Sequence, residues 1–211
     1  MHKELQGGTR FYIVRHGATE TGGNGSIAGG KWDVSLSAKG REQAEALATK
    51  FENTRIDKIM SSDMERAVNT AGPLAQSKRL EVTTTPLLRE RTYGYDVEGK
   101  KKDWEAKAIM TELFRFWTTD QEERKTLRLT PDMETDTEMM DRVTPVFHNT
   151  AEEHPNQTVL FMAHCDLMST FLRTEVSPKE LYNPEHIGHI VVDFNKPTFE
   201  LVAMDGVPRI A

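Results

Sequence analysis

Short apolar runs alternate with longer amphipathic stretches along this chain, and the alternation predicts strands and helices in turn. Apolar runs of about four to eight residues favour buried strands, whereas apolar residues spaced roughly three to four apart favour helices. Strands are predicted over 10–14, 56–60, 81–85, 158–163, 187–194 and 199–204. Helices are predicted from the N-cap Ser37 to 51, and over 64–76, 100–118, 134–153 and 166–174.

Three of these helices contain a residue that affects where the helix begins, bends or ends. Pro73 lies inside 64–76, and we expect it to kink that helix or end it at Gly72. Pro145 is expected to bend the helix over 134–153 in the same way. Asp166 is expected to cap the helix that it begins.

Strands that alternate with helices favour an α/β fold around a largely parallel sheet. A turn at 195–197 lies between the last two strands, so we expect an antiparallel hairpin at one edge of that sheet. The region 95–133 does not continue the alternation. We interpret it as a cap inserted into a single domain that spans residues 1–211.

The composition narrows the classes of function. The formal net charge is −6 and no basic run is present, so no nucleic-acid partner is expected and an anion must bind in a local positive pocket. No apolar run approaches the roughly 20 residues of a membrane span, so no membrane partner is expected. Cys165 is the single cysteine, which excludes a disulfide framework and favours a reducing, cytoplasmic location.

Polar residues suited to phosphate chemistry follow four of the predicted strands. Arg15 and His16 follow the first strand, and Arg66 begins the helix after the second. Glu90 follows the third strand, and His164 follows the most apolar one. Ligands of open α/β sheets bind beyond the carboxyl ends of the strands, so we expect these five side chains to meet.

These residue types can together transfer a phosphoryl group. A neutral imidazole held in one tautomer can attack phosphorus, and we assign that role to His16. Arg15, Arg66 and His164 would stabilise the charge on the phosphoryl oxygens. Glu90 would protonate the leaving oxygen if its pKa is raised. The scheme requires neither a metal ion nor a cofactor.

The order of these motifs adds a second line of argument. The segments concerned are Arg15-His16-Gly17 with Thr19, LSAKGREQA at 36–44, SSDMERA at 61–67, RERTYG at 89–94 and Ala163-His164. Taken together over about residues 9–204, the chain resembles the histidine phosphatase superfamily, which includes cofactor-dependent phosphoglycerate mutases and many phosphatases. The resemblance implies a three-layer α/β/α sandwich and a phosphohistidine intermediate on His16. The chain departs from the family pattern at Gly22, often asparagine, and at Cys165, usually glycine.

Further residues near these motifs are candidates for contact with the substrate: Gly17, Thr19, Arg91 and Tyr93. For Arg91 and Tyr93, an exposed salt bridge and a packed aromatic ring are equal alternatives. Glu98 is an alternative to Glu90 as the acid. His186 belongs to no metal-ligand grouping, and we interpret it as incidental.

The predicted activity is that of a phosphatase acting on a small phosphorylated substrate. A phosphoglycerate mutase-type phosphotransferase is the first alternative, favoured by the segment 89–94. Against it, the stretch 111–117 offers only Arg115, where mutases typically place paired arginines. The second alternative is a non-catalytic phosphate-binding module. The oligomeric state stays open, with a homodimer as one option.

Overall fold

A six-stranded sheet forms the centre of the computed structural model, which describes residues 8–21, 26–99, 103–177 and 180–210. The predictions for Gly22 and for the start of the helix at 100–102 lie outside these residues. The strand order is β3-β2-β4-β1-β6-β7. The strands are β1 (Thr9–Arg15), β2 (Lys58–Ser62), β3 (Val82–Thr85), β4 (Thr158–Ala163), β6 (His189–Asn195) and β7 (Thr198–Asp205). The first four pair in parallel, while β6 and β7 form the predicted antiparallel hairpin at the edge.

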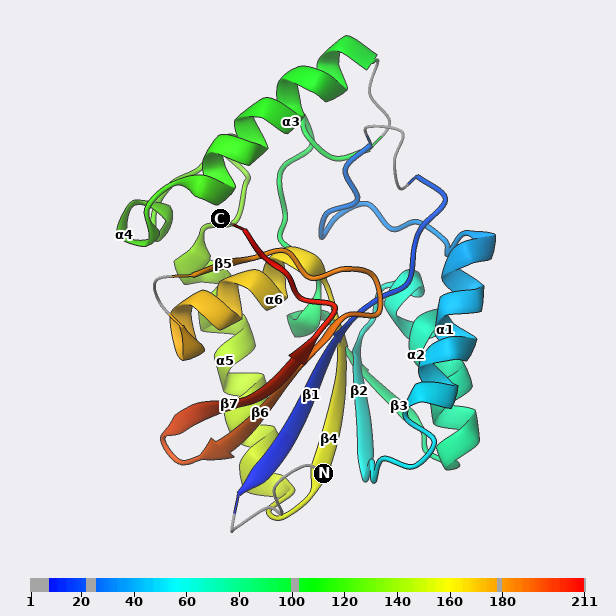
Figure 1. Ribbon diagram of the computed structural model, residues 1–211. Coiled ribbons are helices and arrows are strands. Elements are labelled where there is room, and N and C mark those ends of the chain that lie inside the picture. The colour runs from blue at the N-terminus through cyan, green and yellow to red at the C-terminus, as the bar shows by residue number, and fades with distance from the viewer. Residues whose placement is uncertain (1–7, 22–25, 100–102, 178–179, 211) are drawn as a thin grey trace.

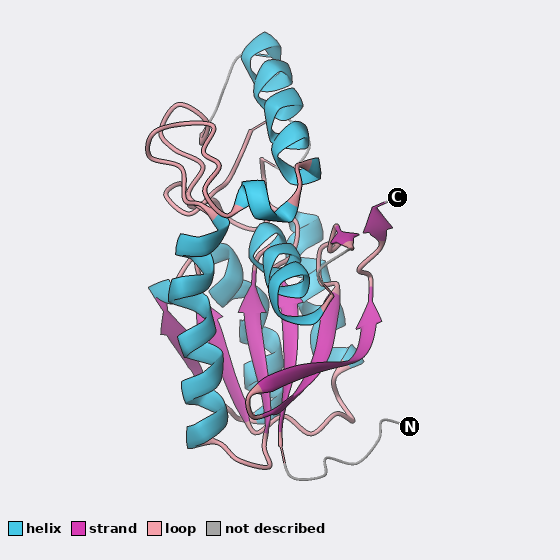
Figure 2. Ribbon diagram, turned by 90° about the vertical axis from the view of Figure 1, so that its left-hand side faces the viewer, coloured by secondary structure: helices cyan, strands magenta, loops and turns pink. Residues whose placement is uncertain are grey.

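Helices cover both faces of the sheet (Figures 1 and 2). One face carries α1 (Ala38–Lys50) and α2 (Glu65–Lys78), and the other carries α5 (Asp136–Glu153) and α6 (Cys165–Phe171). Successive residues of a strand point to opposite faces, and β1 follows this rule. Its Tyr12 and Val14 join the apolar cluster under α1 and α2, whereas Phe11 and Ile13 join the one under α5. The predicted three-layer α/β/α sandwich is therefore confirmed.

The segment between β3 and α5 lies beyond the carboxyl ends of the parallel strands (Figure 1). It begins with a 3-10 turn, Pro86–Leu88, and contains α3 (Asp103–Thr118) and α4 (Gln121–Arg124). A third apolar cluster holds this segment together and consists of Tyr93, Val97, Leu113, Phe116 and Met133. Because that cluster is separate from the two beside the sheet, the segment has the build of an inserted helical cap.

Local sequence explains where two of the helices begin. Ser37 caps α1 by accepting a hydrogen bond from the N–H of Gly40, as predicted. Thr135 and Glu138 form a capping box at the start of α5, which the T-x-x-E spacing indicates. Within the described residues, no helix is long and apolar enough to cross a membrane.

Several predicted boundaries were wrong. The second strand lies two residues later than predicted, because its ladders with β3 and β4 extend to Ser62 and Ser61. Helix α2 does not end at Gly72 but continues through Pro73 to Lys78, where its fully buried Leu74 packs on the sheet. A two-stranded sheet of β5 (Leu181–Tyr182) and β8 (Arg209–Ile210) was not predicted.

The residue at the N-cap of α6 was also predicted wrongly. His164 occupies the N-cap position, while Asp166 lies in the first turn and binds Arg91 and Tyr93 through its carboxylate. The helix continues beyond Phe171 as a π-helical turn over Leu172–Val176.

Candidate active site

The parallel pairing of β1 with β4 brings two histidines together. Arg15 lies opposite Ala163 in the ladder, and the N–H of His16 donates to the carbonyl of Ala163 at 3.1 Å. His164 directly follows β4, and its ring centroid lies 5.1 Å from that of His16 at an interplanar angle of 62°. The register of two neighbouring strands thus places both imidazoles at one point of the sheet edge.

Hydrogen bonds fix the tautomer of His16. Its Nδ1 lies 2.7 Å from the carbonyl oxygen of Gly17, and a carbonyl only accepts, so Nδ1 carries the proton. Its Nε2 lies 3.3 Å from Nε of Arg66, which donates to it. Burial, followed by the charges of Arg66 and Arg15, lowers the pKa of His16 well below 6.5. The ring is therefore neutral at physiological pH and has its lone pair on Nε2.

Arg66 is fully buried at the start of α2 and is held by the loop after β1. Its Nη2 donates to the carbonyl of Gly29 at 3.1 Å, and its Nη1 pairs with Asp33 at 3.1 Å. Asp33 also accepts a hydrogen bond from the N–H of Glu65 at 2.5 Å, so it ties the loop to the helix. The role of Asp33 was not predicted, because its pairing with Arg66 spans 33 residues and has no local signal.

His164 and Arg15, which neighbour His16, have buried nitrogens without a partner among the described residues. His164 is fully buried, yet neither ring nitrogen has a partner among the described residues. Burial and the charge of Arg66 lower the pKa of His164 well below 6.5. Nε of Arg15 is likewise unpartnered within that part of the chain, while its Nη1 donates to the carbonyl of Pro184 at 2.6 Å. Buried polar atoms are seldom left unpaired, so an anion would satisfy Nε of Arg15 and the one N–H of the neutral His164 ring.

Glu90 lies beside the first turn of α6 and is almost completely buried. Its Oε1 accepts from the N–H groups of Arg91 at 2.9 Å and Leu167 at 3.1 Å, and its Oε2 accepts from that of Asp166 at 3.1 Å. Burial, then the negative charge of Asp166, raises the pKa of Glu90 above 4.5. A raised pKa suits a carboxyl that must donate a proton.

Glu98, the alternative acid, has a different environment. Its Oε2 accepts from the N–H groups of Lys31 at 2.8 Å and Trp32 at 2.9 Å, and its Oε1 from that of Tyr93 at 2.8 Å. The carboxylate thus links two loops. Both carboxylates accept three backbone hydrogen bonds, and Glu90 differs in that two of its bonds come from the first turn of α6, directly after His164.

Arg91 and Tyr93 direct their polar atoms into the protein. Nε of Arg91 pairs with Asp166 at 2.6 Å and its Nη2 pairs with Asp136 at 2.6 Å. The hydroxyl of Tyr93 donates to Asp166 at 2.9 Å. Arg124 of α4 pairs with Asp136 at 2.9 Å and completes the network. The alternative of an exposed salt bridge was therefore wrong, because Arg91 and both of its partners are buried.

Gly17 and Thr19 lie in the turn after β1, where the chain packs tightly on α1. A Cβ at Gly17 would lie only 2.7 Å from the carbonyl oxygen of Gly40, so the turn requires glycine. Thr19 is buried and forms an isolated bridge with Leu36. Both residues build the loop that carries His16.

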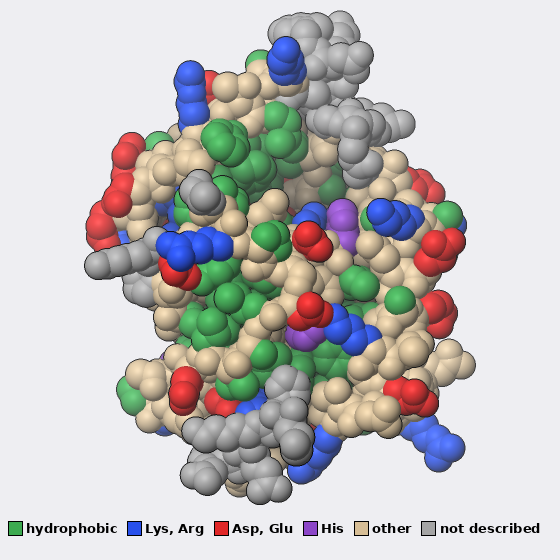
Figure 3. Space-filling view, in the orientation of Figure 1, with side chains coloured by type: hydrophobic (Ala, Val, Ile, Leu, Met, Phe, Trp, Pro, Cys, Tyr) green, Lys and Arg blue, Asp and Glu red, His purple; other side chains and the backbone are tan. Residues whose placement is uncertain are grey.

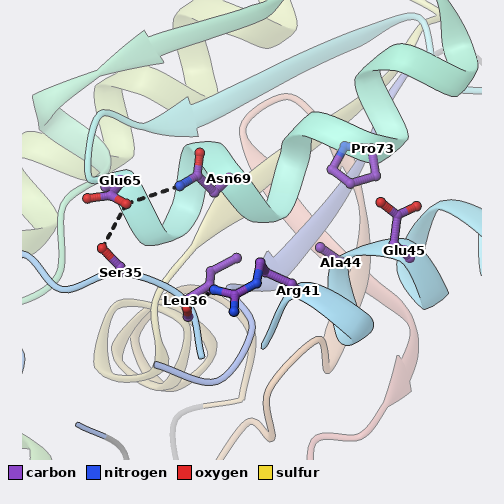
Figure 4. A pocket seen from close by; sticks show the side chains of 8 residues that line it. All are labelled: Ser35, Leu36, Arg41, Ala44, Glu45, Glu65, Asn69 and Pro73. Atoms are coloured by element: carbon purple, nitrogen blue, oxygen red, sulfur yellow. Dashed lines mark hydrogen bonds between the residues drawn. The ribbon is translucent and has the colours of Figure 1, made fainter. Parts of the chain in front are cut away.

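One cavity of about 290 Å³ lies away from these residues, beside α1 and α2 (Figure 4). Its lining consists of Ser35, Leu36, Arg41, Ala44, Glu45, Glu65, Asn69 and Pro73. None of the catalytic candidates lines it, so it is distinct from the histidine site. Among the described residues, no group of three or more His, Cys, Asp and Glu is arranged to hold a metal ion.

Comparison with known proteins agrees with the sequence motifs. The profile of the histidine phosphatase superfamily (branch 1) matches residues 11–204. The probable phosphoglycerate mutase GpmB of Proteus mirabilis is 41% identical over 85 residues, which cover 40% of this chain and 39% of that protein. The chain thus matches about two fifths of this relative's length. The uncharacterized phosphatase PhoE of Bacillus subtilis is 28% identical over 169 residues, 80% of this chain and 78% of PhoE.

Solved structures share the fold. A phosphoglycerate mutase from Bacillus anthracis superposes with a TM-score of 0.77 at 25% identity, covering 94% of this chain and 92% of the other. A mycobacterial glucosyl-3-phosphoglycerate phosphatase superposes with a TM-score of 0.77 at 23% identity, covering 93% and 97%. The family match extends over nearly the whole chain, and the chain therefore belongs to branch 1 of the histidine phosphatase superfamily.

Proposed function

We propose that this protein is a phosphomonoester phosphatase that acts through a phosphohistidine intermediate on His16. One observation carries the proposal: Nε2 of a neutral, buried imidazole accepts a hydrogen bond from Arg66, and the same ring packs against His164. The ring nitrogens of His164 and Nε of Arg15 have no partner among the described residues. A nucleophile surrounded by anion-binding donors is what transfer of a phosphoryl group requires.

In the first step, Nε2 of His16 attacks phosphorus and the bond from phosphorus to the ester oxygen breaks. Arg15, Arg66 and His164 bind the phosphoryl oxygens, and Nε of Arg66 moves its hydrogen bond from Nε2 to one of them. Glu90 gives its proton to the leaving oxygen, which departs as an alcohol. The buried position of Glu90 and its raised pKa support this role.

In the second step, water attacks the phosphohistidine. Glu90, now ionised, accepts a proton from that water, and the bond from phosphorus to Nε2 breaks. Inorganic phosphate leaves, and His16 recovers its neutral form. The hydrogen bond from Nδ1 to Gly17 holds the ring in one orientation through both steps.

We propose that the segment 95–133 forms a cap within a single domain and that this cap selects the leaving group of the substrate. Its own apolar cluster beyond the strand ends supports this assignment. The proposed substrate is a small phosphorylated molecule, and the proposed location is the cytoplasm. Arg91 and Tyr93 were expected to contact the substrate. We propose that they position α6 and Glu90 instead, because Asp166 binds both side chains and Asp136 also binds Arg91.

The second candidate is a phosphoglycerate mutase, and the similarity to GpmB favours it. A mutase passes the phosphoryl group to another hydroxyl instead of water. Incubation with a single isomer of phosphoglycerate and bisphosphoglycerate separates the two activities. Interconversion of the isomers identifies a mutase, and release of inorganic phosphate identifies a phosphatase.

Steady-state hydrolysis of an aryl phosphate tests the proposal. We expect turnover by the wild type and loss of at least about 10³-fold in kcat in His16→Ala. His154→Gln is the matched control. His154 follows α5 and precedes β4, so it lies near the start of that strand and not at its carboxyl end. Equal activity of His16→Ala and wild type would contradict the proposal.

A further inference from the structure

Glu98 joins two segments that are distant in the chain. Its Oε2 accepts from the N–H groups of Lys31 at 2.8 Å and Trp32 at 2.9 Å, both in the loop after β1. Its Oε1 accepts from the N–H of Tyr93 at 2.8 Å. One carboxyl therefore holds the loop that follows the nucleophile against the segment that follows Glu90.

The loop and this segment also touch directly. The N–H of Gly30 donates to the carbonyl of Arg91 at 2.8 Å. A Cβ at Gly30 would lie 2.5 Å from the carbonyl oxygen of Glu90, and one at Gly29 would lie 2.4 Å from Oε1 of Glu98. Glycine at both positions permits this close approach. The loop thus rests on the carboxyl of Glu98 and on the backbone of Glu90.

The same loop holds Arg66. Nη2 of Arg66 donates to the carbonyl of Gly29 at 3.1 Å, and Nη1 donates to that of Trp32 at 3.4 Å. Trp32 therefore binds Glu98 through its N–H and Arg66 through its carbonyl. Nε of Arg66 in turn donates to Nε2 of His16 at 3.3 Å. A continuous chain of hydrogen bonds runs from Glu98 through the loop to the nucleophilic atom.

The segment after Glu90 gives Glu98 a fixed support. The hydroxyl of Tyr93 donates to Asp166 at 2.9 Å, and Nε of Arg91 pairs with the same carboxylate at 2.6 Å. Glu90 itself accepts from the N–H groups of the first turn of α6. Buried charges and backbone bonds thus hold this segment independently of Glu98, whereas the loop depends on Glu98 for its attachment.

Glu98 is placed to act through its neighbours. On the face drawn in Figure 3, an imidazole lies at the surface beside basic and acidic side chains. Glu98, in contrast, is only 8% exposed, and both of its oxygens accept from N–H groups of the protein. Its influence on the reaction must therefore pass through the residues that it binds.

We propose that Glu98 is a positioning residue that fixes Arg66 against His16 by fastening the loop 27–32 to the segment 90–93. The inference rests on the proposed function, in which Arg66 binds the phosphoryl group. It assigns a role to a carboxyl that neither chemical step uses. The phosphoryl group then meets a cation that is already in place, so little reorganisation is required during the reaction.

Glu98→Gln tests this role, because an amide has a similar shape but turns an NH₂ group towards one set of N–H donors. Orthovanadate adopts the trigonal-bipyramidal geometry of a phosphoryl group in transfer and measures the pocket without relying on turnover. We expect Glu98→Gln to bind orthovanadate about tenfold more weakly than the wild type in calorimetric titrations. Undiminished affinity would overturn the proposal.

Asp132→Asn is the matched control. Asp132 joins the same two parts of the chain, since its Oδ2 accepts from Nζ of Lys31 at 2.8 Å and from the N–H of Tyr95 at 3.1 Å. Its ion pair with Lys31 is partly exposed. We expect orthovanadate affinity within about twofold of the wild type. Equal losses in Asp132→Asn and Glu98→Gln would overturn a specific role for Glu98.

Gly30→Ala perturbs the same attachment without a change in charge. Its Cβ would push the loop away from the carbonyl of Glu90, so we expect a loss of orthovanadate affinity similar to that in Glu98→Gln. Weaker binding in Glu98→Gln alone would show that the charge of Glu98 matters and not the position of the loop. Gly30→Ala also carries the test if circular dichroism shows that Glu98→Gln does not fold.

A double-mutant cycle tests whether Glu98 acts through Arg66. Glu98→Gln combined with Arg66→Lys should bind orthovanadate no more than about twofold more weakly than Arg66→Lys alone. If the two losses multiply, Glu98 acts independently of Arg66 and the proposal is wrong.

The leaving group separates positioning from acid catalysis. 4-Nitrophenolate leaves without a proton, whereas an alkoxide needs one. We expect Glu98→Gln to lower kcat/KM by similar factors for 4-nitrophenyl phosphate and for propyl phosphate. A loss confined to propyl phosphate would identify Glu98 as the acid instead.

Formation of a phosphoenzyme from an aryl phosphate is measured on the same proteins. If the wild type forms it and Glu98→Gln binds orthovanadate as tightly as the wild type, the proposed function stands and the positioning role is rejected. If orthovanadate binding depends on Glu98 but the wild type forms no phosphoenzyme, the proposed function is rejected and the role of Glu98 in holding Arg66 stands.

Discussion

Arg66 directs its Nε at Nε2 of His16, 3.3 Å away, while its outer nitrogens bind the carbonyl of Gly29 and the carboxylate of Asp33. The guanidinium is thus fixed on one side by the loop after β1 and presents its remaining donor to the nucleophilic atom. A fixed cation at this point attracts the phosphoryl group and disfavours protonation of the imidazole.

Arg66→Lys should lower kcat/KM for an aryl phosphate by about 10²- to 10³-fold, because an ammonium cannot bind Asp33 and a phosphoryl oxygen with one planar fork. Arg89→Lys is the matched control, since Arg89 makes a two-point pair with Asp63 at the surface. That variant should retain kcat/KM within about twofold. Similar activities of the two variants would exclude a direct role for Arg66.

Asp166→Asn should move the alkaline limb of the pH profile of kcat/KM to lower pH. Glu90 must be protonated to act as the acid, so activity falls as the pH rises through its pKa. The charge of Asp166 helps to raise that pKa above 4.5, and its removal lowers it. The midpoint of the limb is the quantity to measure.

Asp136→Asn controls for damage to the network. Asp136 pairs with the same Arg91, but it is not among the largest influences on the pKa of Glu90. We expect the midpoint of its alkaline limb to match that of the wild type. Identical shifts in both variants would mean that the limb reports disruption of the network and not the charge beside Glu90.

Arg91→Met should destabilise the fold by about 3–5 kcal/mol, because it leaves buried carboxylates of Asp166 and Asp136 without their main partner. Urea denaturation followed by circular dichroism gives the free energy of unfolding. Arg115→Gln, which breaks an exposed pair with Glu112, should have little measurable effect. A small change in Arg91→Met would show that the buried pairs contribute little net stability.

Strand ends were the part of the site that the sequence could predict. His16 and His164 each follow a short apolar run, and parallel pairing of those runs places both side chains at one edge. Ser37 was predictable for a similar reason, because an N-cap depends on neighbours within one turn. In such cases the residue and the feature that positions it are adjacent in the sequence.

Residues positioned by distant partners were missed. Asp33 acts on Arg66 across 33 residues, and Asp166 accepts from Arg91 across 75. The interpretation of Asp166 as a helix cap was wrong, because its carboxylate pairs with the distant Arg91 and not with the N–H groups of its own helix. The ring centroid of His186 lies 6.0 Å from that of His16, because backbone hydrogen bonds join Arg15 to Ile187 and Gly188. No local pattern records these bonds. Charge pairing inside a folded protein has no sequence period comparable to those of strands and helices.

Trapping of the phosphoenzyme tests the central claim most directly. The wild type is mixed rapidly with an aryl phosphate, quenched in alkali, where phosphohistidine survives, and analysed by peptide mass spectrometry. We predict one phosphoryl group on the peptide that contains His16, and none in His16→Ala. A wild type that releases phosphate without any label on His16, or a label that persists in His16→Ala, would contradict the account.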